Sequence, residues 1–254
     1  MIAGLRSCLA LARSVLVYHG DRQRHRRMDA LYKRYLGPGD LALDIGSHVG
    51  DRISSFRRLG ARVIALEPQP GPARVIRLIH GRDPLVTCLH SAAGAKPGQL
   101  MLRVNSRNPT VSTLSGAFVS AARGAKGWES QEWDRSLTVL VTTLDALIAE
   151  HGLPSFIKID VEGYEDQVLA GLTQQVPALS FEFTTIAREI AQACIGRLER
   201  LGPYRFNVAL GETHRLRFAE SVSAAAMKEF LNVLPHEANS GDVYAELPQG
   251  AILR

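Results

Sequence analysis

Short apolar runs alternate with amphipathic segments along most of this chain, and this alternation limits the folds it can adopt. The runs LALDI (41–45) and ARVIALE (61–67) are bounded by Gly or Pro, as is typical of strands in a parallel sheet. Residues 51–60 between them predict a helix, and residues 72–81 predict a second helix that starts at Pro72. Such repeated β–α units predict a doubly wound, mostly parallel α/β sheet.

The same alternation continues in the second half of the chain. Strands are predicted at 85–93, 156–163 and 178–183, and helices at 143–150, 165–172 and 187–201. Two late apolar runs, 204–210 and 243–247, supply candidate strands for an antiparallel edge of the sheet.

The domain organisation follows from two stretches that break this pattern. Residues 94–136 are rich in Gly, Ser, Asn and Arg, and they predict an inserted region of hairpins and loops that serves as an acceptor lid. Residues 1–39 predict a basic helical arm, because Leu5, Leu9, Ala12 and Leu16 recur at helical spacing. The remaining residues, 40–254, predict one domain.

The positive charge of the chain lies in this arm. Residues 1–40 hold eight Lys or Arg and three Asp, and their net +5 equals the net charge of the whole chain. We expect a helix packed on the domain with a solvated Arg-rich face; the alternative is weak contact with an anionic membrane or polyanion. The apolar run is too short to span a bilayer, Arg13 interrupts it, and no signal-peptide cleavage site follows.

The three cysteines, Cys8, Cys88 and Cys194, are scattered and contain no C-x-x-C pair. This usage predicts reduced thiols and a cytoplasmic location.

The ends of the predicted strands carry the residues expected at a cofactor site. Asp44 closes the first strand, and Gly46 and Gly50 then frame a G-x-x-x-G loop in which Ser47 and His48 stand where a dinucleotide fold places a glycine. Gly46 has no side chain, so we expect a ligand to approach the backbone closely at this position. A dinucleotide needs close access of the loop backbone to its two phosphates. S-adenosylmethionine has no phosphate and needs only one close contact with the backbone, so the loop favours this cofactor over NAD.

The next two strand ends extend the expected site. Glu67, followed by Pro68, has a carboxylate that can accept hydrogen bonds from the two hydroxyls of a ribose. The structural alternative is that Glu67 caps the loop at the end of the strand. His90 and Ser91 close the third strand, where an adenine is expected to lie.

Four segments together resemble the FkbM-type methyltransferase family: DIGSHVG, ALEPQP, VTTLDAL and FIKIDVEGYEDQVLAGL. The resemblance runs from about Asp40 to Phe183, and the last segment is its most specific part. It implies a Rossmann-like class I methyltransferase fold and methyl transfer from S-adenosylmethionine to a hydroxyl of a sugar, glycolipid, polyketide or similar natural product.

The resemblance also implies roles for individual residues. Asp44, Gly46 and Gly50 carry over as the cofactor loop, Glu67 as the ribose acid and Asp160 as the acid of the active-site strand end, with Glu162 and Gly163 completing its turn. The chain departs from the usual Gly-Ala-Asn-x-Gly loop at Ser47 and His48.

Methylation of an alcohol needs a base close to the reacting oxygen. The candidates are Asp160 first, then His48, whose ordinary pKa suits the task, and Glu182 at the end of the following strand. For each of these three residues, a purely structural role is the alternative to the role of general base.

Expected acceptor contacts are Glu162, Ser112 and Thr113, with Ser115, Trp128 and Trp133 as weaker candidates. A metal would need several converging oxygen ligands, and no Asp-Asn pair beside Asp160 indicates them, so no metal is expected.

Four other functions fit less well. A nucleic-acid methyltransferase would need a basic body and the Asn/Asp-Pro-Pro-aromatic or Pro-Cys motif, and this chain has neither motif. Another small-molecule acceptor and a non-catalytic S-adenosylmethionine-binding scaffold both remain open. An NAD-dependent dehydrogenase would bind nicotinamide.

Overall fold

The computed structural model describes the backbone of residues 2–248 and the side chains of residues 9–248. A seven-stranded sheet forms the centre of the molecule, with the strand order β3-β2-β1-β7-β8-β10-β9. All neighbouring strands from β3 to β8 pair in parallel, and β10 lies antiparallel between β8 and β9. The predicted doubly wound, mostly parallel sheet with an antiparallel edge is therefore confirmed.

The elements of this layer have the following bounds. The strands are β1 (Leu41–Ile45), β2 (Arg62–Leu66), β3 (Val86–Leu89), β7 (Phe156–Ile159), β8 (Ala178–Thr184), β9 (Arg205–Leu210) and β10 (Ser240–Glu246). The helices are α1 (Ile2–His19), α2 (Arg22–Tyr32), α3 (Asp51–Arg58), α4 (Pro70–His80), α6 (Leu144–His151), α7 (Glu165–Ala170), α8 (Arg188–Leu201) and α9 (Ala224–Val233). A 3-10 turn, η2 (His236–Ala238), precedes β10.

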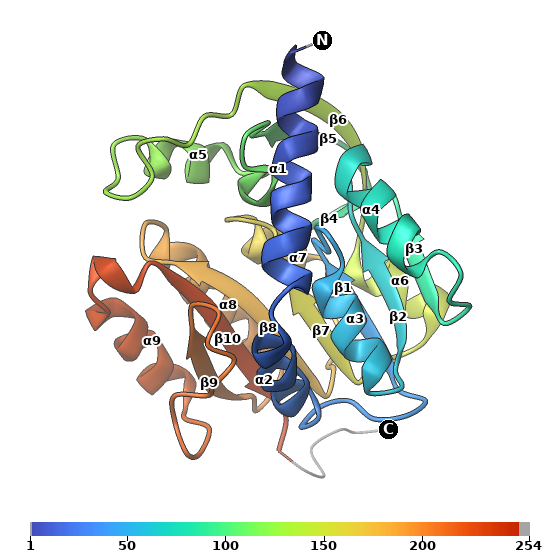
Figure 1. The fold of residues 1–254 in the computed structure, drawn as a ribbon. Coiled ribbons are helices and arrows are strands. Elements are labelled where there is room, and N and C mark those ends of the chain that lie inside the picture. Colours follow the sequence, from blue (N-terminus) through green and yellow to red (C-terminus); the bar gives the residue numbers. More distant parts are fainter. Residues whose placement is uncertain (1, 249–254) are drawn as a thin grey trace.

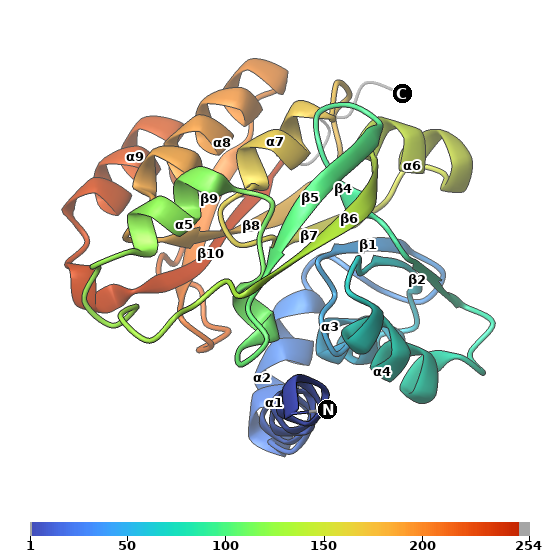
Figure 2. The same ribbon diagram turned by 90° about the horizontal axis from the view of Figure 1, so that it is seen from above.

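Two apolar cores cover the two faces of the sheet, because successive strand residues point to opposite sides. In β1, Leu43 and Ile45 pack with α6 to α9, whereas Ala42 packs against α2 and α3. Figure 2 shows these two groups of helices on opposite sides of the sheet. This arrangement leaves the carboxyl ends of the parallel strands free to form a site.

The inserted region forms a second, three-stranded sheet of β4 (Ala92–Ala93), β6 (Arg135–Thr142) and β5 (Gly98–Val104). Between β5 and β6 lie the 3-10 turn η1 (Pro109–Val111) and α5 (Gly116–Ala122), a helix that the sequence did not predict. Ser115 caps α5 by accepting a hydrogen bond from the Phe118 N–H. Trp128 and Trp133 pack with Phe118 in a small core of this region.

The N-terminal arm packs on the domain through α2, whereas Leu9, Ala12 and Leu16 of the predicted apolar face are exposed. Met28, Leu31 and Tyr32 lie in the core that α3 and β7 share. Arg24 departs from the expected solvated face, because it is buried and forms ion pairs. The side chains of Leu5, Arg6 and Cys8 lie outside the described ones. None of the described helices combines the length and apolarity that crossing a lipid bilayer requires.

Candidate active site

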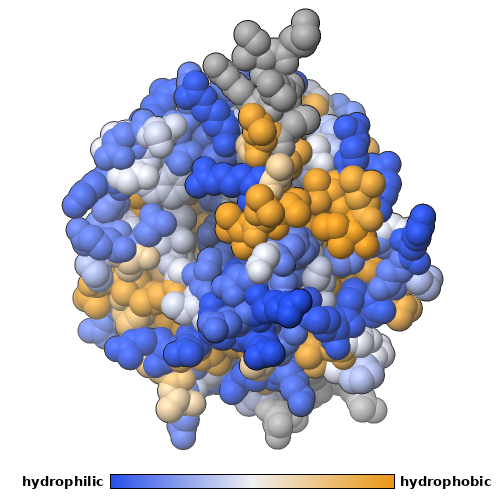
Figure 3. Space-filling model, viewed as in Figure 1, coloured by the Kyte–Doolittle hydropathy of each residue, from blue (hydrophilic) through white to orange (hydrophobic). Residues whose placement is uncertain are grey.

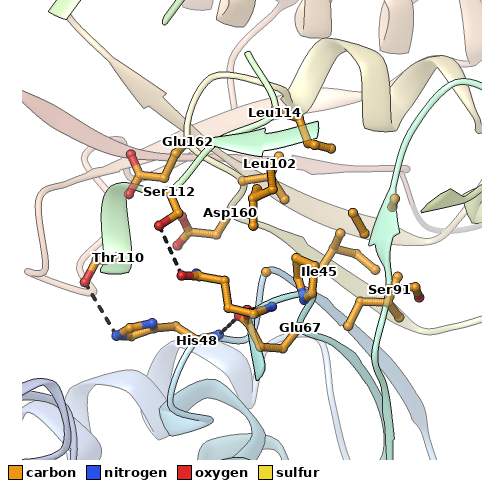
Figure 4. Close-up of a pocket in the computed structure, with 17 residues that line it drawn as sticks. Ile45, His48, Glu67, Ser91, Leu102, Thr110, Ser112, Leu114, Asp160 and Glu162 are labelled. Atoms are coloured by element: carbon orange, nitrogen blue, oxygen red, sulfur yellow. Dashed lines mark hydrogen bonds between the residues drawn. The ribbon is translucent and has the colours of Figure 1, made fainter. Parts of the chain in front are cut away.

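Loops at the carboxyl ends of β1, β2, β3 and β7 surround a cavity, which we call the cofactor cavity (Figure 4). The inserted region closes it from the other side through Leu102, Thr110, Ser112 and Leu114. The sequence-predicted residues among its lining are Gly46, His48, Glu67, Pro68, Ser91, Ser112, Asp160 and Glu162.

The backbone of the first loop depends on Gly46. Its φ of +85° lies in the left-handed region, and an added Cβ would lie 1.8 Å from the carbonyl oxygen of Asp160. Only glycine therefore allows the loops after β1 and β7 to approach this closely. This corrects our expectation for Gly46, because the neighbouring backbone, rather than a ligand, fills the space that a side chain would need.

Glu67 holds the second loop in place. Its Oε2 accepts a hydrogen bond from the His48 N–H at 2.9 Å, and its Oε1 accepts one from the Gln69 N–H at 2.7 Å. Burial raises the pKa of Glu67 to about 8, although these donors oppose the shift. Each carboxylate oxygen keeps a second lone pair, so the loop-capping role and the predicted ribose contact are compatible.

His48 lies where the first loop meets the inserted region. Its Nε2 is 3.5 Å from the Thr110 hydroxyl oxygen, and its ring meets the Tyr18 ring edge-on at 5.8 Å. Burial lowers the pKa of His48 to about 4, which makes the imidazole a poor general base near neutral pH.

A second hollow, which we call the acid cavity, adjoins the cofactor cavity. The two share Gly46, His48, Thr110, Asp160 and Glu162. Its further lining includes Tyr18, Asp44, Ser47 and Glu182. Asp160, Glu162 and Glu182 each place one carboxylate oxygen within 4.8 Å of the others. We refer to these three residues as the carboxylate cluster.

The cluster is only partly neutralised. Lys158, fully buried in β7, has its Nζ 3.1 Å from Asp160 Oδ2 and 2.6 Å from Asp242 Oδ1. Burial alone would lower the pKa of Lys158, but the two carboxylates raise it well above its usual range. Among the described side chains, no cation pairs with Glu162 or Glu182. Burial and the nearby Asp160 charge raise the pKa of both glutamates well above its usual range.

A paired set of charges lies beside this cavity, and we call it the arginine network: Arg24, Asp51, Arg52 and Glu212. Asp51 Oδ2 is 2.8 Å from Arg24 Nη1 and 2.7 Å from Arg52 Nη1, with all three side chains nearly buried. Burial would raise the pKa of Asp51, but Arg52 and Arg24 hold it below its usual range. The network ties α2 to the start of α3 and to the loop after β9.

Several sequence-predicted residues lie outside the two cavities: Gly50, His90, Thr113, Gly163, Ser115, Trp128 and Trp133. Gly50 caps α3 in a left-handed conformation against Ile53 and Ile76. His90 lines a different hollow, beside α4. The Thr113 hydroxyl accepts a hydrogen bond from the Ser115 N–H within the inserted region.

Gln69 and the Lys158–Asp242 pair are site residues that sequence reasoning missed. Gln69 joins the β2 loop to the inserted region, because its Nε2 donates to the Pro109 carbonyl and its Oε1 accepts from the Ser112 hydroxyl. A lysine inside the apolar run FIKI was a signal of a buried ion pair, but its partner lies 84 residues away.

The cavities fit the S-adenosylmethionine that the sequence predicts. Ile45, Leu66, Leu102 and Leu114 provide apolar walls of the kind that an adenine ring needs. Asp44 is 1% exposed and its Oδ2 has no hydrogen-bond donor among the described residues, so it suits the ammonium group of the cofactor. The negative charge of the acid cavity also suits a sulfonium cation.

Comparison with solved structures found distant similarity to several methyltransferases. A precorrin-6y C5,15-methyltransferase from Geobacter metallireducens shares 14% identity at a TM-score of 0.45, over 87% of this chain and 88% of that one. An O-methyltransferase from Bacillus cereus, in complex with SAH, shares 12% identity at a TM-score of 0.44, over 94% and 91% of the two chains. No curated protein matched the sequence.

A family model described as "Methyltransferase FkbM domain" matches residues 44–233, well over half of the chain. The match contains the loop after β1, Glu67 and the whole carboxylate cluster. The chain therefore belongs to the FkbM methyltransferase family, as the sequence motifs predicted, and is an S-adenosylmethionine-dependent methyltransferase.

Proposed function

We propose that this enzyme methylates a hydroxyl group on a sugar, glycolipid or polyketide-type natural product. The observation that carries the proposal is the position of Asp160, whose side chain lines both the cofactor cavity and the acid cavity. The side chain is 31% exposed, so an acceptor hydroxyl in the acid cavity can reach it.

Asp160 is the proposed general base. When bound, S-adenosylmethionine supplies an electrophilic methyl group: the acceptor oxygen bonds to its carbon as the carbon–sulfur bond breaks, and sulfur keeps the electron pair. Asp160 accepts the hydroxyl proton, and Lys158 fixes its carboxylate from 3.1 Å. The low pKa of His48 disfavours it as the base, and Glu182 is the remaining alternative.

The acceptor is proposed to enter between α1 and the inserted region. A groove there is lined by polar side chains and shares Tyr18 and Thr110 with the acid cavity. Its polar lining includes Arg13, Ser14, Arg107, Asn108, Ser130 and Gln131. Such a lining suits an acceptor with several hydroxyls, and it supports the role of residues 94–136 as the acceptor lid.

The test is turnover of labelled S-adenosylmethionine with panels of sugars, glycolipids and polyketides, and with RNA and DNA as a separate arm. We expect methylation of a hydroxylated acceptor, and a fall in kcat of about a hundredfold or more in Asp160→Asn. Glu189→Gln, an exposed acid on α8, is the control and should keep full activity.

Each failure has its own meaning. Full activity in Asp160→Asn removes this residue as the base. Methylation in the nucleic-acid arm alone overturns the proposed acceptor class, and cofactor binding without turnover on any acceptor supports a scaffold instead.

We further propose that α1 and α4 contact an anionic membrane surface from a cytoplasmic location. Exposed apolar side chains gather over these two helices in Figure 3: Leu9, Leu16, Val17, Leu78 and Ile79. Exposed Arg13, Arg74 and Arg77 on the same helices complement anionic headgroups. Cys88 and Cys194 are free thiols, consistent with a reducing compartment.

Co-sedimentation with vesicles tests this contact. We expect binding to vesicles that contain phosphatidylserine, weaker binding to pure phosphatidylcholine, and loss of binding in the double variant Leu16→Asp/Leu78→Asp. Equal sedimentation of this variant and the parent chain contradicts the proposed surface.

A further inference from the structure

We propose that the carboxylate cluster binds a divalent cation that prefers oxygen ligands, such as Mg²⁺ or Mn²⁺. Asp160, Glu162 and Glu182 each place an oxygen within 4.8 Å of the other two. Carboxylate oxygens are the ligands that these cations prefer in proteins. The sequence predicted no metal, because no Asp-Asn pair beside Asp160 indicated further oxygen ligands.

Burial of Glu162 is an independent indication of a ligand. Glu162 is only 7% exposed and lines the acid cavity, and its carboxylate has no hydrogen-bond or ion-pair partner among the described residues. The Oε2 atom of Glu182 is fully buried and has no donor among the described residues. A buried carboxylate without a partner is strongly unfavourable. Both groups face the same cavity, so one bound cation would satisfy them together.

The cations already present are engaged elsewhere. Lys158 contacts Asp160 and Asp242, and its Nζ also donates to the Ile159 carbonyl. Arg24 and Arg52 are paired with Asp51 and Glu212. Among the described residues, no cation is therefore left to pair with Glu162 or Glu182.

The location gives the cation a catalytic use. The acid cavity is open, and the cluster forms one part of its wall, so an acceptor hydroxyl can complete the coordination of a bound cation. Coordination lowers the pKa of the hydroxyl, and its proton then passes more readily to a neighbouring carboxylate. The proposal that a cation binds depends only on the carboxylate cluster, whereas the proposed catalytic role of the cation rests on the proposed function.

The direct test is binding of Mn²⁺ alone to the full chain, measured by electron paramagnetic resonance and by calorimetry without S-adenosylmethionine or acceptor. We expect one saturable site from which Mg²⁺ displaces Mn²⁺. Glu162→Gln and Glu182→Gln should each weaken Mn²⁺ binding about tenfold or more. Glu189→Gln should bind like the parent chain, and circular dichroism of every variant checks that it is folded.

The outcomes separate this proposal from the proposed function. Absence of saturable Mn²⁺ binding, or unchanged affinity in both folded glutamate variants, overturns the cation site, even if a hydroxyl acceptor is methylated. Saturable binding that both variants weaken supports the site, even if no hydroxylated acceptor is ever turned over. Where an acceptor is found, we expect EDTA to abolish turnover and Mn²⁺ to restore it.

Discussion

Residues of the arginine network and of the carboxylate cluster line the same acid cavity, yet the two groups differ in how their buried charges are paired. In the network, Asp51 contacts both Arg24 and Arg52 at less than 3 Å. In the cluster, Glu162 and Glu182 have no cation among the described residues, and Lys158 reaches only Asp160. The pKa of Asp51 is accordingly lowered, whereas the pKa values of the two glutamates are raised.

This difference separates a structural from a functional use of charge. The network joins α2, α3 and the loop after β9, and each of its buried charges has a partner of opposite sign. The cluster joins the ends of β7 and β8 and leaves its charges for something that enters the cavity. Functional sites commonly hold such unfavourable arrangements, which the surrounding fold must stabilise.

Removing a cation from the network should produce the largest loss of stability. Arg24→Ala deletes one of the two partners of buried Asp51, the ion pair with Glu212 and the hydrogen bond to the Tyr18 carbonyl. We expect a loss of about 2–3 kcal/mol, and a fall in Tm of roughly 5 °C or more, by thermal denaturation. Arg26→Ala, an exposed position on the same helix, is the matched control. Equal Tm values for the two variants would show that the network does not hold α2.

The pH dependence of stability should reflect the buried acids of the cavity. Glu67 has a raised pKa of about 8 when folded, so the unfolded chain releases this proton at lower pH than the folded chain. Its contribution is fully present below its ordinary pKa of 4.5 and is lost as pH rises to about 8. Asp44, with a pKa of about 7, acts in the same direction.

We therefore expect Tm to fall by roughly 5 °C between pH 5 and pH 8. Glu67→Gln should flatten this slope, whatever its Tm at a single pH. Asp51 affects the pH dependence of stability in the opposite direction. Its pKa is lowered in the folded chain, so its contribution to stability is lost only as the solution becomes acidic. An unchanged slope in Glu67→Gln would show that this carboxyl titrates normally.

The smallest effect is expected at the exposed end of the network. The Glu212 side chain is 52% exposed, although it contacts Arg24 at 2.8 Å and Arg52 at 3.3 Å. Solvent screens such pairs, so Glu212→Gln should lose less than about 1 kcal/mol. Denaturant unfolding at low and high salt should show that even this difference shrinks with salt. A loss as large as that of Arg24→Ala would place Glu212 among the essential partners.

Much of the fold was predictable because local signals agreed with it. The apolar runs at 41–45 and 61–67 lie in β1 and β2, and the helix predicted from Pro72 is α4, which begins at Pro70. The helix α9 was missed, because residues 224–233 lack a strong boundary signal beyond Ser223, which caps the helix. The pairing of β10 between β8 and β9 depends on contacts that are distant in sequence.

Site residues were predictable from the sequence only where they directly follow a predicted strand. Glu67 and Asp160 follow β2 and β7 and line the cofactor cavity, as we expected from their positions. Convergence of Glu182 on Asp160 required knowing that β8 lies next to β7. The same holds for Lys158 and Asp242, which belong to strands that β8 separates.

The most direct test of the contrast between the two regions is one pair of thermal denaturation curves, recorded at pH 8 in EDTA. Asp51→Asn and Glu182→Gln each replace one buried carboxylate by its amide. We predict that Asp51→Asn lowers Tm by several degrees, about 3 °C or more, because it leaves two buried arginines with less compensation. Glu182→Gln should leave Tm unchanged or raise it, because it removes repulsion from Asp160 and Glu162. A fall in Tm for Glu182→Gln as large as that for Asp51→Asn would contradict this account.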